Sequence, residues 1–515
     1  MEYIKNCAVI VNMIKESDIR DFNPWWKDLN KIYEDEKIIN WKDSTINFIP
    51  RLKHKITWDF LSDNTVIYTL RGPRQVGKTT MIKIQIKDFL EKGIAPWNIL
   101  YYSLDLASTK QDIVDVIEKY MKITSRHRGN RRNYLFLDEV SSVYDWQKGI
   151  KWLVDQKKLT NSTVMVTGSE AIDIKNATER LPNRKGRIDD NHDKVLLPMK
   201  FSEFASLNED IKDIISDFGL LTFDERKNIF MRLVNNEIDE RIDKLNAYQN
   251  ELNDLLKEYM LAGGTPQVIN EKFATSLISE RTYTNYLEGI TGEWNKLGKN
   301  ETLLKQFGAV IIKSLTSHIS WTNLSKEAAL GNPNTASDYA LTLQDLFVLS
   351  IIHLYGTDKR IPMIQKDRKF YFQDPFFLHI FNGWINTKDS FESSLKYTES
   401  EENRSKIIEG ITADHLIRLA FSLSKKKQTF EYSSHVFYWK DDKNKEVDFI
   451  FYDGDSIEVP IEVKFRNRIN YKELSGLTNF LSKTGRESGI VLSKSDLDIK
   501  TDYTIIPASV FLLLI

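Results

Sequence analysis

Apolar and polar positions alternate in two rhythms between residues 66 and 169. Short apolar runs, which are typical of buried strands, are separated by amphipathic segments with a helical period. The apolar runs are VIYTL, NILYYSLDL, YLFLDEV and STVMVTGS, and the segments between them are MIKIQIKDFLEKG, DIVDVIEKYMK and DWQKGIKWLVDQKKL. Because strands that alternate with helices form parallel sheets, this pattern predicts an α/β domain built on a doubly wound parallel sheet.

Different patterns lie on either side of this region. Residues 14–60 are aromatic and charged, and their NPWW motif predicts an N-terminal cap over residues 1–60 whose tryptophans pack on the next domain. Residues 202–260 have the period of charged amphipathic helices. We therefore expect the first large domain to span residues 61–270.

The middle of the chain has the element order of a winged-helix domain, which we place at residues 281–385. Asn332 and Pro333 suit the turn before its third helix. That helix carries Asp338 and Asp345 but no lysine or arginine. Since DNA-reading helices offer basic or amide side chains, its composition favours a structural or subunit-contact role over DNA reading.

The end of the chain returns to an α/β pattern. A helix after residue 405 precedes a strand-rich segment, and a further helix is expected near residues 471–483. We place this last domain at residues 400–515. The linkers between the domains are expected near residues 271–280 and 386–404.

Composition limits the partners. A chain of 515 residues predicts two to four domains. The net charge of −1 excludes a general field for polyanions, so DNA contacts would need local basic clusters such as SRHRGNRR (125–132) or SKKKQ (424–428). A single cysteine, Cys7, and the lack of an apolar run long enough to cross a bilayer predict a soluble cytoplasmic protein without membrane partners.

The segment RGPRQVGKTT (71–80) has the spacing of a phosphate-binding loop, G-x-x-x-x-G-K-[ST]. It follows an apolar strand and opens a helix, as this motif requires. Loop N–H groups would surround the β-phosphate of ATP, Lys78 would contact the β- and γ-phosphates, and the Thr79 hydroxyl would ligate Mg²⁺. The residues expected to bind the nucleotide here are Gly72, Pro73, Arg74, Gln75, Val76, Gly77, Lys78, Thr79 and Thr80.

Two later strands end in polar residues that complete this site. YLFLDEV ends in Asp138, expected to hold Mg²⁺, and Glu139, expected to orient the attacking water as a catalytic residue. VMVTGS ends in Thr167 and Ser169, and either hydroxyl could sense the γ-phosphate.

The stretch EVDFIFYDGDSIEVPIEVK predicts a hairpin near the end of the chain. If Gly454 to Ser456 form its loop, facing residue numbers sum to 910, and Asp448 lies opposite Glu462. Lys464 shares a strand face with Glu462, while Val447, Phe449 and Phe451 are expected on one apolar face. Opposed carboxylates repel, and a divalent cation such as Mg²⁺ would neutralise them. A solvated acid–lysine pair without metal is the alternative.

The motifs RGPRQVGKTT, FLDEV, TGS, ERLPNRKGR, PMKFSEF and YMLAGGTP together resemble archaeal-type AAA+/STAND-like P-loop ATPases. This resemblance implies a P-loop sheet with a helical lid closed by the GGTP turn (263–266), a winged-helix domain, and a C-terminal restriction-endonuclease-like domain. It also implies that an arginine of ERLPNRKGR contacts the nucleotide or a neighbouring subunit, the choice being Arg180, Arg184 or Arg187. Read without the resemblance, the segment is a basic loop.

The D-x(n)-E-x-K pattern likewise resembles the core of the restriction-endonuclease superfamily. By that resemblance Asp448 and Glu462 ligate Mg²⁺, Lys464 assists catalysis, and Glu409 is an additional acid. Arg466 and Arg468 could contact a DNA backbone. Two functions follow as hypotheses. The first is an ATPase coupled to a Mg²⁺-dependent domain that binds or cleaves DNA. The second is a nucleotide-operated switch, which could form a homo-oligomer and whose last domain docks partners without cutting.

Overall fold

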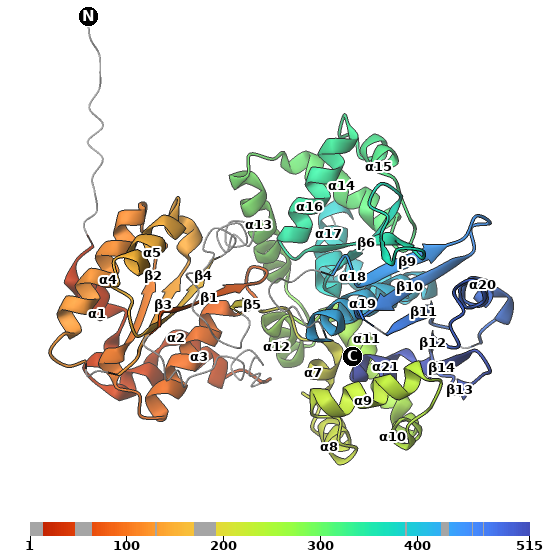
Figure 1. Cartoon of the computed structure of the whole chain (residues 1–515), viewed down its shortest axis with the longest axis horizontal. Helices are drawn as coiled ribbons and strands as arrows, with labels where there is room; N and C mark the ends of the chain where they lie inside the picture. Colours follow the sequence, from red (N-terminus) through yellow and green to blue (C-terminus); the bar gives the residue numbers. More distant parts are fainter. Residues whose placement is uncertain are drawn as a thin grey trace, which may run out of the picture. The chain divides into compact units, whose positions relative to one another are not determined.

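The structure is a computed structural model that describes residues 14–46, 64–128, 131–168, 192–386, 389–423, 432–455, 457–466 and 468–515. The chain forms two compact units (Figure 1). The first unit contains Met1–Arg71 and Gly77–Leu196, and the second contains Gly72–Val76 and Leu197–Ile515.

The first unit is built on a five-stranded sheet in the order β2-β3-β4-β1-β5. Every neighbouring pair of strands is parallel, which confirms the predicted doubly wound sheet. Helices α4 and α5 cover one face and α2 and α3 the other (Figure 1). The strands are β1 (Val66–Arg71), β2 (Ile99–Ser103), β3 (Asn133–Asp138), β4 (Ser162–Thr167) and β5 (Asp193–Val195), and the helices are α1 (Glu16–Asp21), α2 (Glu36–Lys42), α3 (Lys78–Glu91), α4 (Lys110–Thr124) and α5 (Trp146–Asp155).

The N-terminal segment packs on this sheet through its aromatic and amide side chains. The Trp26 indole donates to the carbonyl of Ile99 at 2.9 Å and stacks on Trp97. The Asn23 side chain bonds both backbone groups of Tyr101, at 2.7 and 2.8 Å. The predicted packing of the tryptophan motif on the α/β domain is therefore confirmed.

Most helices of the second unit lie between residues 201 and 423. Two segments expected as linkers are instead partly helical, because α12 extends to Thr275 and α18 fills residues 390–399. The helices are α7 (Phe201–Ala205), α8 (Glu209–Asp217), α9 (Phe223–Val234), α10 (Glu240–Leu245), α11 (Gln249–Ala262), α12 (Pro266–Thr275), α13 (Glu280–Lys296), α14 (Glu301–Lys313), α15 (Trp321–Glu327), α16 (Pro333–Asp345), α17 (Pro375–Asn386), α18 (Ser390–Glu399) and α19 (Glu401–Leu423).

One sheet joins the middle of the chain to its end. Its order is β13-β14-β12-β11-β10-β9-β6-β7, and β8 pairs with the other side of β6. Strand β6 pairs in parallel with β9, so the two strands expected in a winged-helix domain share a sheet with the strands of the last domain. The strands are β6 (Leu349–Gly356), β7 (Ile361–Pro362), β8 (Arg368–Phe372), β9 (Val436–Lys440), β10 (Glu446–Tyr452), β11 (Glu458–Lys464), β12 (Gly489–Ser493), β13 (Asp498–Ile499) and β14 (Tyr503–Pro507).

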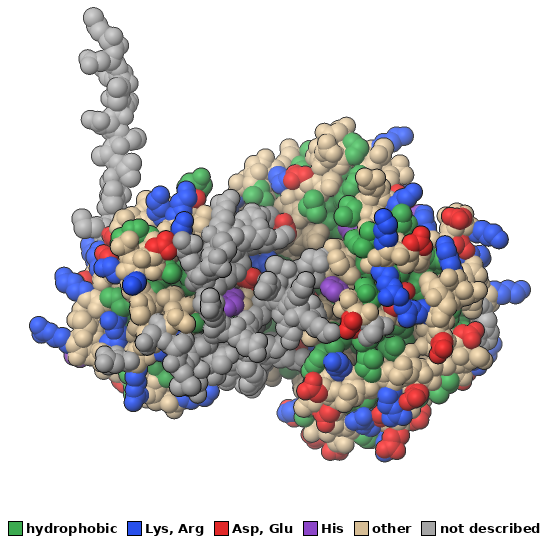
Figure 2. Space-filling model, viewed as in Figure 1, with side chains coloured by type: hydrophobic (Ala, Val, Ile, Leu, Met, Phe, Trp, Pro, Cys, Tyr) green, Lys and Arg blue, Asp and Glu red, His purple; other side chains and the backbone are tan. Residues whose placement is uncertain are grey.

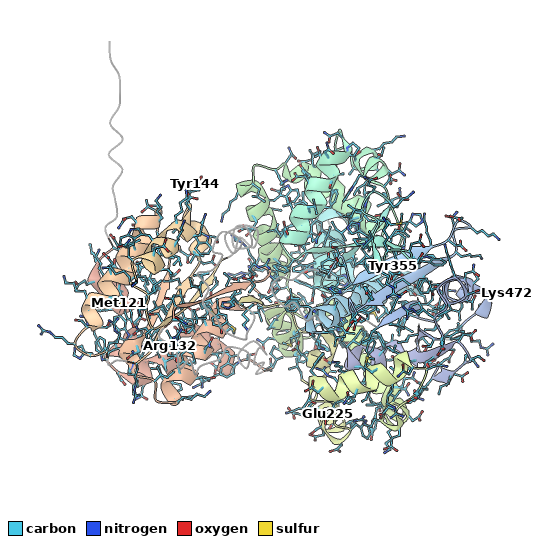
Figure 3. All side chains as sticks on the ribbon, viewed as in Figure 1. Met121, Arg132, Tyr144, Glu225, Tyr355 and Lys472 are labelled. Atoms are coloured by element: carbon cyan, nitrogen blue, oxygen red, sulfur yellow. The ribbon has the colours of Figure 1, made fainter. Side chains whose placement is uncertain are left out.

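Helices cover both faces of this sheet. On one face α20 (Ser475–Thr484) buries Phe480 against a cluster that contains Tyr355, Val447 and Ile450, and Tyr355 is marked in Figure 3. On the other face α19 packs against β8, β9, β10 and β11. The last helix, α21 (Ala508–Leu514), is buried throughout.

The GGTP turn is held inside the second unit by two close approaches. A Cβ atom on Gly264 would lie 1.9 Å from the Met199 carbonyl oxygen, and one on Gly263 would lie 1.9 Å from the Asp374 carboxylate. Asp374 accepts hydrogen bonds from the N–H groups of Gly264 and Phe376, at 2.7 and 2.8 Å. Only glycine fits at these two positions. The contacts described here tie the turn to Met199 and Asp374, and its role in a lid stays a prediction.

The surface carries mixed charge. On the face shown in Figure 2, basic and acidic side chains are interspersed over the second unit. This agrees with a chain whose net charge is −1. Across the described ranges, no helix has both the length and the apolar character needed to cross a membrane.

Candidate functional site

The phosphate-type loop leaves β1 and enters α3 through Gly77. Gly77 has a φ of 99° in the left-handed region, and no atom lies near the position of a Cβ there, so conformation rather than space requires glycine. The Lys78 side chain is buried at the first position of α3. Because the first N–H groups of a helix lack partners within it, this end of α3 suits an anion such as a phosphate.

The central residues of the loop group with the second unit. Arg74 forms an ion pair with Glu293 of α13, and the Tyr286 hydroxyl donates to the carbonyl of Gln75 at 3.3 Å. The Arg74 charge therefore already has a carboxylate partner.

Asp138, at the end of β3, accepts hydrogen bonds from three hydroxyl groups. Thr79 Oγ1 donates at 2.7 Å, Thr167 Oγ1 at 2.9 Å and the Tyr101 hydroxyl at 3.1 Å. The arrangement follows from the strand order, because β4 lies between β1 and β3 and β2 lies on the other side of β3. The sheet thus brings four chain segments to one buried carboxylate.

Tyr101 is a member of this site that the sequence did not indicate. The parallel register pairs Ser103 with Asp138, so Tyr101, two residues earlier, lies on the same strand face. Burial, together with the Asp138 charge, raises the pKa of Tyr101 well above its usual value, so the phenol keeps its proton. Tyr101 could have been predicted from the register of β2 against β3, but that register is known only once the order of the strands in the sheet is known.

The N-terminal cap helps to fix Tyr101. Asn23 holds its backbone, as described above, and the Lys83 ammonium lies 3.6 Å from the centre of its ring. Lys83 in turn pairs with Asp35 of the cap at 3.0 Å. Residues outside the P-loop motifs therefore set the position of one Asp138 partner.

Glu139 follows Asp138 in a left-handed conformation, with φ of 55°. Such a conformation is uncommon for a residue with a side chain and is often found at functional sites. Asp138 and Thr79 supply the carboxylate and hydroxyl oxygens that Mg²⁺ prefers, so the residues present fit a Mg²⁺–nucleotide site. Ser169 and the candidate arginines Arg180, Arg184 and Arg187 lie outside the described residues.

A second group of charged residues lies in the second unit, on the hairpin of β10 and β11. Phe449 pairs with Ile461 and Tyr452 with Glu458, which confirms the predicted register. The Asp448 N–H donates to Glu462 at 3.3 Å, and the Lys464 ammonium contacts Glu462. The three predicted residues do converge on one surface.

The predicted apolar face of β10 is wrong in one respect. A β-bulge lies between Val447 and Ile450, opposite β9. Val447 and Ile450 share the cluster under α20, whereas Phe449 packs on Tyr371 and Phe451 on Phe230. Because a bulge inserts one residue, it breaks the strict alternation that the prediction assumed.

The centre of this charged group is Lys369 of β8, whose side chain is fully buried. Its ammonium lies 3.3 Å from Glu409 and 3.5 Å from Asp448, and it also contacts Glu446. The Tyr371 hydroxyl donates to Glu409 at 2.5 Å. Sequence reasoning missed Lys369, because it lies 79 residues before Asp448 and reaches it only through the pairing of β8, β6, β9 and β10.

Burial and charge set the protonation of this group. Burial, followed by the Asp448 charge, raises the pKa of Glu409 to about 7 and that of Glu462 to about 8. Burial would also raise the pKa of Asp448, but Lys464 and Lys369 outweigh it and lower that pKa. Protons on the two glutamates can therefore offset the excess of acidic groups near neutral pH.

The arrangement does not fit a divalent cation. Both oxygens of Asp448 already have donors, Lys369 and the Val463 N–H, and both oxygens of Glu462 have Lys464 and the Asp448 N–H. Within the described ranges, no group of three or more acidic, histidine or cysteine side chains is arranged to hold a metal.

Two other basic candidates, Arg466 and Arg132, are engaged within the protein. Arg466 pairs with Glu473 at 3.0 Å. Arg132, marked in Figure 3, is buried and donates to Thr163 and to the carbonyl of Ser162. Arg468 is exposed, and the SKKKQ segment lies outside the described residues. In α16, Asp338 pairs with Lys299, and the role of this helix stays a prediction.

Comparison with known families finds three matches along the chain. Residues 64–205 match an AAA domain, residues 253–388 match a domain of unknown function (DUF8612), and residues 409–511 match another domain of unknown function (DUF4143). No curated protein matches the chain.

Two solved structures are similar at low identity. A Walker-type ATPase of Pyrococcus abyssi is 14% identical with a TM-score of 0.37, covering 61% of this chain and 90% of its own. The ORC2 protein of Aeropyrum pernix, in ADPNP–ADP complexes, is 10% identical with a TM-score of 0.31, covering 68% of this chain and 94% of its own. TM-scores this low do not establish a shared fold.

Proposed function

From the AAA domain that spans residues 64–205, we propose that this protein binds ATP with Mg²⁺ and hydrolyses it. The observation that carries the proposal is the contact between Thr79 and Asp138 at 2.7 Å. It supports the proposal because the two residues expected to ligate Mg²⁺, one at the start of α3 and one at the end of β3, are in contact.

Each residue has a distinct part in the proposed reaction. The loop N–H groups and Lys78 bind and orient the phosphates, and Glu139 positions and polarises the attacking water. Thr79 and Asp138 would hold Mg²⁺, which when bound neutralises charge on the phosphates. Thr167 holds Asp138 in the geometry described and is placed at the strand end from which it could sense the γ-phosphate.

The test compares Lys78→Ala with a matched change at the exposed Lys110, which opens the neighbouring helix α4. Lys78→Ala should reduce ATP turnover to background while the far-ultraviolet circular dichroism spectrum stays that of the wild type. Lys110→Ala should retain turnover. Equal turnover in all three proteins, or a folded wild type without affinity for Mg²⁺–ATP, contradicts the proposal.

For the second unit, we propose the role of a docking module in a nucleotide-operated switch. The internally paired carboxylates and the acidic α16 favour it over DNA chemistry. A homo-oligomer whose size depends on nucleotide is the expected form. Size-exclusion chromatography with and without a non-hydrolysable ATP analogue tests whether the oligomer changes size. The same elution volume in both conditions would count against the switch.

Mg²⁺-dependent DNA binding or cleavage is the second candidate: the convergence of Asp448, Glu462 and Lys464 favours it, whereas the donors that already contact the two carboxylates argue against it. The test incubates plasmid DNA with the protein and Mg²⁺ or Mn²⁺. If this centre cleaves DNA, the wild-type protein should nick the plasmid and the Lys464→Ala variant should not. Absence of nicking in the wild type, or equal nicking by both proteins, leaves the docking role as the one supported.

A further inference from the structure

The carboxylates of the second unit surround an ammonium group. Lys369 Nζ lies within 3.5 Å of Glu409 on α19 and of Asp448 on β10, contacts Glu446, and lies 5.7 Å from the centre of the Tyr438 ring. The lysine side chain has no exposed surface. A lysine is seldom fully buried unless it is paired, and this one has three acidic partners.

The carboxylates of Asp448 and Glu462 leave little coordination capacity for a metal. Asp448 directs one oxygen at Lys369 and accepts at the other from the Val463 N–H at 2.8 Å. The Glu462 oxygens are taken by Lys464 and the Asp448 N–H. A metal bound to Asp448 would have to break one of these contacts.

Repulsion between the Lys369 ammonium and an incoming metal cation also disfavours metal binding. A cation that ligates Asp448 would lie only a few ångströms from the Lys369 ammonium. Two positive charges this close together repel strongly in the protein interior, and the burial of Lys369 prevents its ammonium from moving into water. The lysine must leave or lose its proton before the metal enters.

We propose that the Lys369 ammonium is the resident cation of this centre, so that the native centre takes up no divalent metal and its carboxylates instead tie α19 to β8 and β10. Lys369 thus determines whether the fold can act as a metal enzyme. Removing it should open a divalent-cation site formed by Glu409, Asp448 and Glu462.

The test measures Mn²⁺ binding to the full chain without nucleotide, by isothermal titration calorimetry and by loss of the free Mn²⁺ signal in electron paramagnetic resonance. All proteins carry Asp138→Asn, so that the AAA domain contributes no Mn²⁺ site. The variants are Lys369→Met, the matched exposed-lysine control Lys366→Met, and Lys369→Met combined with Asp448→Asn and Glu462→Gln.

Lys369→Met should bind Mn²⁺ at least tenfold more tightly than the parent, and Mn²⁺ should raise its melting temperature. Both gains should vanish in the combined variant and be absent from Lys366→Met. If Lys369→Met does not fold, Lys369→Gln, which keeps a hydrogen-bond donor, replaces it.

Two results would overturn the proposal. One is Mn²⁺ binding by the parent protein that Asp448→Asn with Glu462→Gln abolishes. The other is a folded Lys369 variant that gains no Mn²⁺ affinity. Neither depends on ATP turnover, so failure of the proposed ATPase function is recognised separately.

Discussion

Asp138, at the end of β3, and Asp448, within β10, are both largely buried carboxylates, but different groups contact them. Asp138 accepts from the hydroxyls of Thr79, Thr167 and Tyr101, which carry no charge. Asp448 faces Lys369, whose positive charge competes with any cation. At the scale of the residue, we therefore propose that neutral hydroxyl donors leave Asp138 better suited to Mg²⁺ than Asp448.

The first prediction concerns Tyr101. Tyr101→Phe removes one donor to a buried carboxylate, an interaction worth about 1.5–3 kcal/mol. We expect Asp138 to be less well fixed and ATP turnover to fall about tenfold, with steady-state kinetics as the measurement. Asn23→Ala, which frees the Tyr101 backbone, should act in the same direction.

Tyr102→Phe is the control for this prediction. Tyr102 is the next residue on β2, and its ring packs against Phe22 instead of pointing at Asp138. Turnover in Tyr102→Phe should match the wild type. A Tyr101→Phe enzyme that is as active as Tyr102→Phe would show that the hydroxyl contact has no functional role.

The second prediction concerns Asp374. Burial raises its pKa to about 7, against the hydrogen bonds from Gly264 and Phe376. Between about pH 4 and pH 7 the folded state therefore holds a proton that the unfolded state has released, so stability falls as pH rises through this range. At about 1.4 kcal/mol per pH unit, the wild type should lose about 2–3 kcal/mol from pH 5 to pH 8 through this group.

Urea unfolding of the wild type and Asp374→Asn at pH 5 and pH 8 measures this. Because other raised carboxyls titrate in both proteins, only the difference between the two pH effects reports on Asp374. The variant should show the smaller decline. Equal declines would mean that Asp374 is ionised in the folded protein throughout the range.

At the scale of the element, backbone contacts determine which face of a strand a side chain occupies and how a turn is held, and the pattern of apolar and polar residues does not specify either. The bulge in β10 moves Val447 to the α20 face while Asp448 stays beside Glu462. The GGTP turn is similarly fixed by its approach to Met199, whose N–H donates to the Gly264 carbonyl at 2.6 Å.

The third prediction follows from that turn. In Gly264→Ala the new Cβ would lie 1.9 Å from the Met199 carbonyl oxygen, and the backbone hydrogen bond prevents its retreat. We expect the second unit to lose about 2–3 kcal/mol of stability or more, as for overpacked sites. Gly292→Ala on α13, where no atom lies within 4 Å, should instead be neutral or stabilise by up to about 1 kcal/mol. Thermal melts of both variants test this prediction. Similar melting temperatures would contradict the close approach of Gly264 to Met199.

At the scale of the whole molecule, the chain forms two units with separate sheets. Proteins built this way often unfold in more than one transition, so a single melting temperature does not describe them. A ligand that binds the folded form of one unit stabilises that unit by an amount that grows with the logarithm of the ligand concentration relative to Kd.

The fourth prediction uses this property. Differential scanning calorimetry with a non-hydrolysable ATP analogue and Mg²⁺ should move the transition of the first unit upwards, by about 2.7 kcal/mol in stability at a ligand concentration one hundred times Kd. Asp138→Asn should weaken the dependence of this shift on Mg²⁺, whereas Asp455→Asn, at an exposed turn of the second unit, should not. No shift in the wild type would argue against the nucleotide site.

The sequence determined much of the first unit by itself. Strand and helix periods are local, so β1 to β4 and the helices between them were predicted from short segments, as was the loop from Gly72 to Thr79. The hairpin register was also predicted, because one short turn fixes the pairing of Phe449 with Ile461.

Only the tertiary structure decided which distant residues meet. The place of Tyr101 beside Asp138 depends on the order of β2 and β3, and that of Lys369 beside Asp448 depends on β8, β6 and β9 forming one sheet with β10. Strand order is set by packing between segments far apart in the chain, which no local pattern records. For this reason the sequence predicted two metal-binding acids at Asp448 and Glu462 but not Lys369, which pairs with Asp448 in the structure.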